Sequence, residues 1–409
     1  MPTRFARISI GFCLLALAGC SASTGSSPSS TASEGGGSPD ASTSTGPEPT
    51  ATAAPSDEPT GSDLSGGDPA ADLWIFRGDG IIRADATTGE EVGQRAFEDW
   101  GCQWHGLAGV GPSAAWIVGV GIGSIPEGGM FPPPPSEDPL TGGCVGRLPL
   151  DGGEAEIFTF DVPEGERPHF WDGAVHGEDA LFAVAHIANE GGALGTGNSD
   201  LYRASADGTV EIVASGIVDV AVAGDSYFVI NDPDSDGFTA AARVDPDSGE
   251  VTQVPFDAIP HHAVYNVEAN GDLAVFSITS SEPYGRGLIA TDADGTVIGS
   301  AIEQVADGES LFSYRGIWVT PDALIAQSDG VVMAPMEQNA TVEILDVCSP
   351  IGTPDDPPEC RYDALYGVAD GVWAQHTVQT ATPQVTTLRR YDGASRTKGA
   401  EVELPTVVR

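Results

Sequence analysis

Histidine and aromatic residues recur in this chain just before one repeated strand, and they offer its most evident chemistry. The set is Trp104, His105, His169, Trp171, His261, His262, Tyr314, Arg315 and Tyr362. Imidazoles that converge on one point can bind a transition metal or act as a general base, because histidine titrates near neutral pH. Aromatic rings at the same place can instead stack on a sugar. The alternative is that all nine are ordinary polar rim residues bonded to loop backbone.

Three carboxylates form a second candidate site in the stretch "DPDSDG" at 232–237. They are Asp232, Asp234 and Asp236. Their spacing matches the first half of a calcium loop, D-x-D-x-D-G, in which Gly237 would make the turn. Arg243 stands at the twelfth position, where such a loop carries a bidentate Glu, and Ala240 stands at the ninth. The stretch therefore predicts either calcium or a plain acidic turn.

The elements that must position these residues repeat along the chain. One apolar strand recurs seven times, and each copy is followed by a hairpin such as "ARVDPDSGEV" (242–251) or "LYRASADGTVEI" (201–212). A further short strand precedes every copy except the first. At about 48 residues per unit, seven four-stranded units predict an all-β β-propeller over residues 72–409. The first unit lacks an evident innermost strand, which leaves closure of the ring open.

Two of the hairpins resemble a known repeat. The stretches "ADATTGEEV" (84–92) and "VDPDSGEV" (244–251) look like the A-x-D-x-x-T-G repeat of quinoproteins. Residues 72–409 as a whole resemble the quinoprotein-like and YVTN-like group of seven-bladed bacterial propellers. The tryptophan that follows the repeat in that family is absent, since Gly93 and Val254 stand near its place. The resemblance therefore implies the fold rather than a quinone cofactor.

Loop lengths predict which face of the propeller carries the functional site. If the strands of a blade are lettered A to D from the axis outward, the D-to-A and B-to-C loops share one face. The long loops 121–143 and 188–199 both belong to that set. Long loops on a rigid scaffold commonly carry function. Four of the six cysteines fall on this loop-rich face, and we expect the disulfides Cys102–Cys144 and Cys348–Cys360.

The amino terminus predicts the cellular location of the protein. Arg4 and Arg7 precede an apolar stretch from Ile8 to Ala18, which has the length of a signal peptide core. The following "LAGC" resembles the lipobox of bacterial lipoproteins, which implies that residues 1–20 include a signal and that Cys20 is acylated. Residues 21–71 are mostly Ser, Thr, Gly, Pro and Ala and predict a disordered tether. The expected location is the cell membrane, lipid-anchored and facing the outside.

Charge and motifs narrow the function classes. The formal net charge of −43 repels phosphate backbones and argues against a nucleic-acid partner. The sequence holds no G-x-S-x-G, H-E-x-x-H or Walker-type motif, so no catalytic residues are assigned. No cofactor is certain, and calcium and a transition metal are the two candidates.

Three function classes remain open. The leading hypothesis is a binding module that holds a glycan, a peptide or an envelope protein at its loop-rich face. The alternative is a metal-dependent polysaccharide lyase or hydrolase with a His cluster at the channel mouth. That enzyme requires His105, His169 and one of His261 or His262 within a few ångströms of one point. A third class is a structural partner of an envelope complex.

Overall fold

The structure is a computed structural model. It describes residues 64–404 except 67, 99, 123–140, 164–165, 189–198, 233–238, 257–262, 282–283, 306–313, 315, 349–359 and 380–384. All of the described residues belong to one compact unit, Glu58–Arg409. Within them, no helix has the length and apolar character needed to span a membrane.

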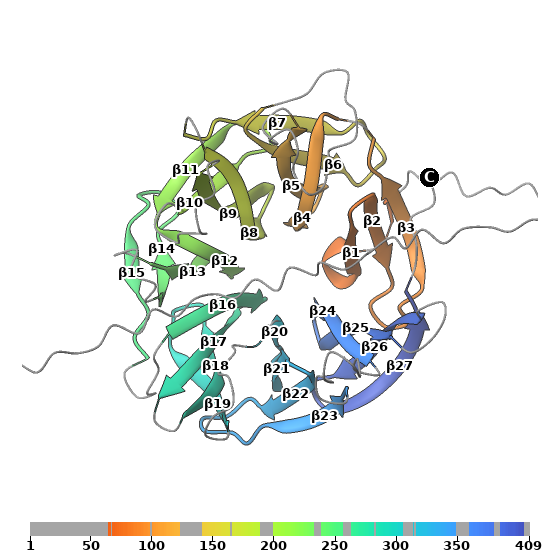
Figure 1. Ribbon diagram of the computed structural model, residues 1–409, viewed down its shortest axis with the longest axis vertical. Helices are drawn as coiled ribbons and strands as arrows, with labels where there is room; N and C mark the ends of the chain where they lie inside the picture. Colours follow the sequence, from red (N-terminus) through yellow and green to blue (C-terminus); the bar gives the residue numbers. More distant parts are fainter. Residues whose placement is uncertain are drawn as a thin grey trace, which may run out of the picture. The chain divides into compact units, whose positions relative to one another are not determined.

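The fold is an all-β β-propeller whose seven antiparallel sheets are arranged around an axis, as the sequence predicted (Figure 1). The first blade contains β1 (Leu73–Arg77), β2 (Gly80–Ala84) and β3 (Glu91–Ala96). The second contains β4 (Cys102–Val110), β5 (Ala114–Gly121), β6 (Gly143–Pro149) and β7 (Glu156–Phe160). The third contains β8 (Glu166–His176), β9 (Asp179–Ala188), β10 (Ser199–Ala204) and β11 (Val210–Ser215).

The remaining four blades follow the same order from the axis outward. The fourth contains β12 (Ile217–Ala223), β13 (Ser226–Asn231), β14 (Ala240–Val244) and β15 (Val251–Gln253). The fifth contains β16 (Ala263–Asn270), β17 (Leu273–Ser281), β18 (Tyr284–Asp292) and β19 (Val297–Gln304). The sixth contains β20 (Gly316–Val319), β21 (Ala323–Gln327), β22 (Gly330–Pro335) and β23 (Glu343–Val347). The seventh contains β24 (Cys360–Val368), β25 (Gly371–Val378), β26 (Val385–Asp392) and β27 (Thr397–Glu403).

The first blade departs from the expected four strands. In the described residues its sheet has three, ordered β1-β2-β3, whereas the other six sheets have four. β1 matches the second strand of the other blades in sequence, yet it lies innermost and contacts the inner strands β24 and β4 of the neighbouring blades. The sheet therefore begins at its second strand, and packing against two neighbours takes the place of an inner partner.

Buried apolar strands between neighbouring blades form the core. All eight residues of β5 are buried, as are all five of β21. Such continuous apolar strands are expected where both faces of a sheet are covered. The interface of the fourth and fifth blades shows the packing, where the rings of Phe228 and Phe276 meet edge to face at 5.9 Å.

The repeated hairpins owe their shape to local chemistry. In the hairpin at 242–251, the Asp245 carboxylate accepts hydrogen bonds from the backbone N–H groups of Asp247 and Ser248. Gly249 then adopts a φ of +69°, which favours glycine over residues with a side chain. The Asp and Gly of the repeat thus turn the chain, and the flanking strands pair as the outer part of a blade.

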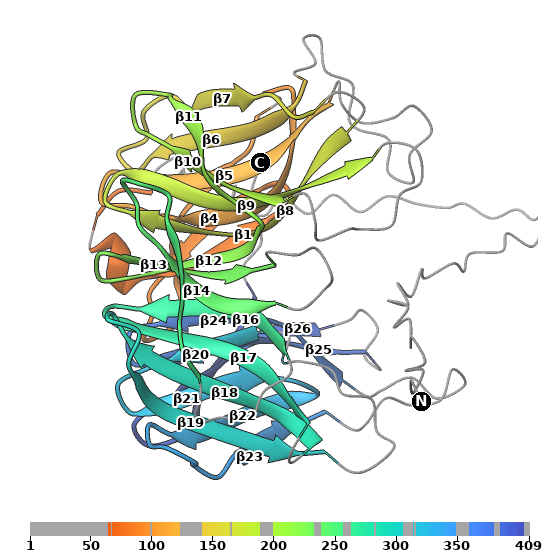
Figure 2. The ribbon, with the colours of Figure 1, turned by 90° about the vertical axis from the view of Figure 1, so that its left-hand side faces the viewer.

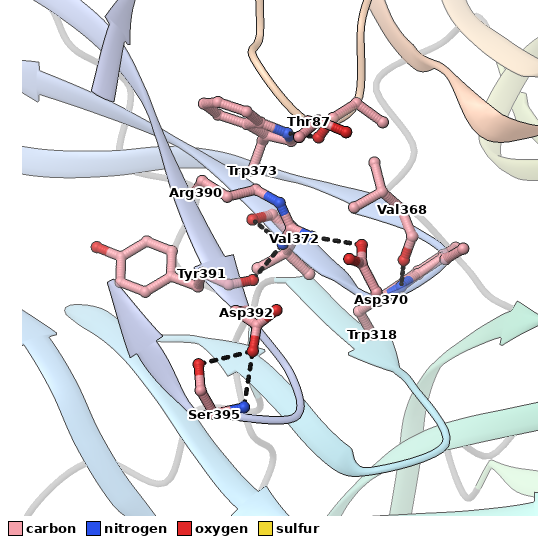
Figure 3. A network of polar contacts seen from close by, with 12 residues as sticks. Thr87, Trp318, Val368, Asp370, Val372, Trp373, Arg390, Tyr391, Asp392 and Ser395 are labelled. Atoms are coloured by element: carbon pink, nitrogen blue, oxygen red, sulfur yellow. Dashed lines mark hydrogen bonds and ion pairs between the residues drawn. The ribbon is translucent and has the colours of Figure 1, made fainter. Parts of the chain in front are cut away.

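The ring closes through side chains of the first and seventh blades. Trp373 of β25 is fully buried against Leu73, Ile75 and Ile82 of the first blade. Its indole N–H donates to the Ala86 carbonyl at 2.8 Å. Figure 3 shows this corner, where the Arg390 guanidinium pairs with Asp370 beside Trp373. Apolar packing with one long-range hydrogen bond therefore joins the two ends of the described chain.

The folded region begins earlier than the expected boundary at residue 72. Leu64 is buried among the side chains between the first two blades, with 1% of its surface exposed. Buried Arg83 donates to the Leu64 carbonyl at 2.6 Å and also pairs with Asp72. The only large apolar side chain of the expected tether is thus part of the propeller core.

Candidate binding site at the channel mouth

Five of the inner strands share one irregularity. The register shifts between Trp104 and Gly106, Phe170 and Gly173, Ile217 and Asp219, Val264 and Asn266, and Tyr362 and Ala364. The additional residues, which we call the bulge ring, are His105, Trp171, Asp172, Val218, Tyr265 and Asp363. A bulge re-aims a side chain and is frequent beside functional sites.

The bulge ring lies toward the loop-rich face. Strands run roughly along the propeller axis (Figure 2), and each inner strand begins where the D-to-A loop of that face ends. Each of the five shifts falls near the beginning of its strand. His105, Trp171, Tyr265 and Asp363 are exposed at these positions. Their exposure at the axis makes this mouth the candidate site.

Two histidines and a tryptophan meet on the inner strands of the second and third blades. The imidazole of His169 contacts the ring of Trp171 edge-on, with 5.0 Å between ring centres. His105 is exposed at the mouth, yet the surrounding strands displace enough water for burial to lower its pKa. The charges of His169 and Arg167 lower the pKa of His105 further. Burial and Arg167 also lower the pKa of His169. Both imidazoles are therefore neutral at neutral pH and can donate and accept hydrogen bonds.

Three carboxyl groups approach one another on the inner strands of the third, fourth and fifth blades. Asp219, 5% exposed, accepts from the N–H groups of Val220 and Val267, both at 2.8 Å. Burial raises the pKa of Asp172 to about 6. Burial, followed by the charge of Asp172, raises the pKa of Asp219 and of Glu268 well above the usual range. Asp172, Asp219 and Glu268, here called the channel acids, therefore retain protons well above the usual titration range of carboxyl groups.

The sequence carries a signal for the channel acids. In "FWDGAV", "IVDVAVA" and "NVEAN", a carboxylate interrupts an otherwise mainly apolar inner strand in three successive repeats. A charge within a strand that the fold must partly bury is expected to have a functional or structural reason. Tyr265 gave no comparable signal, since only the bulge of β16 exposes it.

Three predicted mouth residues lie in the core instead. Trp104 packs in an aromatic cluster with Phe97 and Trp100 and is 8% exposed. Tyr314 and Tyr362 are 1% and 3% exposed. Successive strand residues face opposite sides, so Trp104 is buried where the adjacent His105 is exposed.

The hydroxyl groups of the two buried tyrosines are satisfied inside the protein. The Tyr314 hydroxyl donates to Glu303, and the Tyr362 hydroxyl bonds to that of Tyr391, both at 3.0 Å. Neither is available to a ligand at the mouth. His261, His262 and Arg315 lie outside the described residues, as does Cys20.

Both expected disulfides are present. Cys102 opens β4 and bonds to Cys144 of β6, with the two Cα atoms 6.4 Å apart. The bond spans β5 and ties the inner strand of the second blade to its third strand. Cys348 bonds to Cys360 just before the seventh blade, with a Cα separation of 5.3 Å.

Metal ligands are sparse among the residues that the structure describes. There, only Cys348, Cys360 and His376 form a group of three ligand atoms within 4.8 Å of one another. His105 and His169 have no third described ligand at coordinating distance. His261 and His262, one of which the lyase or hydrolase hypothesis requires, lie outside the described residues. Asp232 is 1% exposed, and both of its carboxylate oxygens lack a hydrogen-bond partner. Asp234 and Asp236 lie outside the described residues.

Comparison with known proteins finds similarities among solved structures only. No protein-family model matches the chain, and no curated protein matches it. Among solved structures it is similar to an acylaminoacyl peptidase of Pyrococcus horikoshii, at 12% identity and a TM-score of 0.42, over 78% of this chain and 48% of that one. It is also similar to TolB of Acinetobacter baumannii, at 12% identity and a TM-score of 0.36, over 80% and 77% of the two chains.

A third similar structure is a putative gluconolactonase, at 14% identity and a TM-score of 0.36, over 69% of this chain and 94% of that one. The chain spans about half the length of the peptidase. At such low identity these likenesses concern the fold alone. The protein is a seven-bladed β-propeller, and its site has to be interpreted from its own residues.

Proposed function

We propose that this protein is a binding module that holds a saccharide at the mouth of its propeller channel. The bulge ring carries the proposal. Trp171 and Tyr265 are 41% and 38% exposed on inner strands, although large aromatic side chains are usually covered there. Exposed aromatic faces with polar neighbours are typical of sites that stack on a sugar ring and bond to its hydroxyl groups.

The charge state of the mouth favours a neutral ligand. The two imidazoles are uncharged, because burial lowers the pKa of both His105 and His169. The channel acids hold protons longer than ordinary carboxyl groups, because burial raises their pKa values. A protonated carboxyl group donates one hydrogen bond and accepts others, as a sugar hydroxyl does. The mouth is therefore polar, and below the Asp172 pKa of about 6 the channel acids add little charge to it.

The proposed location supports a glycan of the cell envelope as the ligand. The lipobox-like "LAGC" and the Ser- and Gly-rich residues that follow are consistent with a lipid anchor on Cys20 and a tether. A tethered propeller would search the space next to the membrane. Binding rather than catalysis is proposed, because the described part of the mouth offers no nucleophile motif and no complete metal site.

Binding to a defined panel tests the proposal. The purified full chain is titrated with neutral oligosaccharides of envelope type and with a lysine-rich peptide, and affinity is followed by calorimetry. Trp171→Ala should weaken saccharide binding about tenfold or more, as loss of a stacked aromatic anchor does. Ile212→Ala is the matched control, since Ile212 is 54% exposed on the outermost strand β11 of the same blade.

Three results would contradict the proposal. The first is that no oligosaccharide binds, and the second is that the peptide binds while the saccharides do not. The third is that Trp171→Ala and Ile212→Ala lower saccharide affinity equally, because that would remove the mouth from the site.

A further inference from the structure

A buried imidazole lies against one of the two disulfides. His376 of β25 is 3% exposed, and one of its ring nitrogens lies within 4.8 Å of the sulfur atoms of both Cys348 and Cys360. Its Nδ1 is buried and has no hydrogen-bond partner. The ring of Tyr362 packs on the imidazole with 5.1 Å between ring centres. A fixed imidazole whose Nδ1 is unpaired thus lies beside two sulfur atoms.

Strand pairing explains why these groups meet. Cys360 pairs with Val378, and Tyr362 pairs with His376, across β24 and β25. Cys360 and His376 are therefore diagonal neighbours on the same face of the sheet. Cys348 directly follows β23, and its N–H donates to the Asp329 carbonyl at 2.9 Å. Two blades hold the three side chains in place.

The unpaired nitrogen is not explained by the oxidised protein. A buried polar atom without a partner is rare and calls for a reason. A disulfide sulfur has no proton to donate and is only a weak acceptor, so the disulfide is a poor hydrogen-bond partner for either imidazole nitrogen. Two thiolates with an imidazole nitrogen are, in contrast, a ligand set typical of zinc.

We propose that reduction of the Cys348–Cys360 disulfide creates a zinc site formed by Cys348, Cys360 and His376. Three protein ligands leave the fourth tetrahedral position to water. Two thiolates that each lie about 2.3 Å from a tetrahedral zinc are about 3.8 Å apart, so the bonded sulfur atoms must separate when the disulfide is reduced. The imidazole nitrogen already lies within 4.8 Å of both sulfur atoms. The inference is independent of saccharide binding at the channel mouth.

The chemistry of the switch balances with an external dithiol as reductant. One reductant thiolate attacks a protein sulfur and breaks the Cys348–Cys360 bond. The second reductant thiol then resolves the mixed disulfide, so the reductant leaves oxidised and the protein gains two electrons and two protons. Zinc displaces those two protons when both sulfur atoms bind as thiolates.

Solvent exposure distinguishes the Cys348–Cys360 disulfide from the Cys102–Cys144 disulfide. Cys360 is only partly buried, whereas Cys102 and Cys144 are 8% and 0% exposed. Thiol exchange requires an accessible sulfur. A mild reductant should therefore open Cys348–Cys360 first and leave Cys102–Cys144 closed.

Cobalt titration of the full chain tests the proposal, because cobalt reports thiolate ligands by its absorption. After mild reduction with a phosphine and its removal, one equivalent of cobalt should give thiolate charge-transfer and tetrahedral bands, which zinc then displaces. The oxidised protein should give neither band. His376→Gln should weaken zinc binding about 100-fold or more, and Cys348→Ser should abolish the charge-transfer bands. A Cys102→Ser, Cys144→Ser double variant is the matched control and should retain the site.

Alkylation of the wild-type protein decides the question even if a variant fails to fold. Zinc should protect Cys348 and Cys360 of the reduced protein from iodoacetamide, as measured by peptide mass. The proposal is wrong if zinc gives no protection, if reduced protein shows no cobalt–thiolate absorption, or if His376→Gln binds zinc as tightly as the wild type.

Discussion

The channel acids contribute stability that is lost as pH rises from acid to neutral. Burial raises the pKa of Asp172 to about 6, from a usual value of 3.8. The folded state therefore binds the proton more tightly than the unfolded state. This contribution to stability is fully present below the unfolded pKa of 3.8 and is lost as pH rises through about 6. The pKa values of Asp219 and Glu268 are raised in the same direction, so their loss follows the same sign.

The size of the effect follows from the shift. About two pKa units at 1.36 kcal/mol each correspond to roughly 3 kcal/mol for Asp172. The side chain keeps some contact with water in the channel, since it is half-buried by surface area. Solvent screening therefore reduces the expected loss to about 1–2 kcal/mol.

The variant Asp172→Asn isolates this contribution. Asparagine cannot ionise, yet its side-chain oxygen can still accept the hydrogen bond that Gly173 N–H donates to Asp172 at 2.7 Å. The free energy of unfolding of the variant, relative to wild type, should rise by about 1–2 kcal/mol between pH 4 and pH 8. Titrating groups that do not interact with Asp172 cancel in this difference. Asp219 and Glu268 do not cancel, but removing the Asp172 charge lowers their pKa values and changes the difference in the same direction.

Urea unfolding, followed by tryptophan fluorescence at pH 4 and pH 8, measures the free energies of unfolding of the variant and the wild type. Glu90→Gln is the control, because Glu90 is exposed on an outer hairpin, and its difference from wild type should not change with pH. A constant or falling difference for Asp172→Asn would refute the reasoning. The raised pKa of Asp172 is a premise of the saccharide proposal, and that premise would then be wrong.

Three further predictions concern stability. Trp373→Phe keeps the apolar contact at the ring closure but loses the hydrogen bond to the Ala86 carbonyl, so urea unfolding should show a loss of about 1 kcal/mol; no measurable loss would show that this bond does not help to close the ring. Replacing Cys102 and Cys144 by serine opens a loop with a sequence separation of 42, so unfolding under non-reducing conditions should show a loss of about 4 kcal/mol; a much smaller loss would contradict a role for the bridge in restricting the unfolded chain. Calcium should raise the midpoint of thermal unfolding of the wild type but not of Asp232→Asn, since both oxygens of Asp232 are buried without a donor; an equal rise in both proteins would exclude Asp232 as a ligand.

Much of the fold could be predicted from local patterns. The hairpin at 242–251 is specified within ten residues, because Asp245 and Gly249 make the turn and the flanking residues have strand character. Its repetition predicted a propeller without any knowledge of contacts between blades. The disulfides followed from the same repeat, since it placed Cys102 beside Cys144 and Cys348 beside Cys360.

The sequence by itself determined the strands, the turns, the repeat and the pairing of cysteines, because each depends on residues close together in one unit or, for Cys348–Cys360, in the link between two units. Only the tertiary structure decided which inner-strand residues reach the channel. Alternation along the strand turns Trp104 into the core, and the bulge presents the additional residue His105 at the mouth. Three blades had to assemble before Asp172, Asp219 and Glu268 could raise one another's pKa values. Those relations arise from packing between distant segments, where no local pattern carries the information.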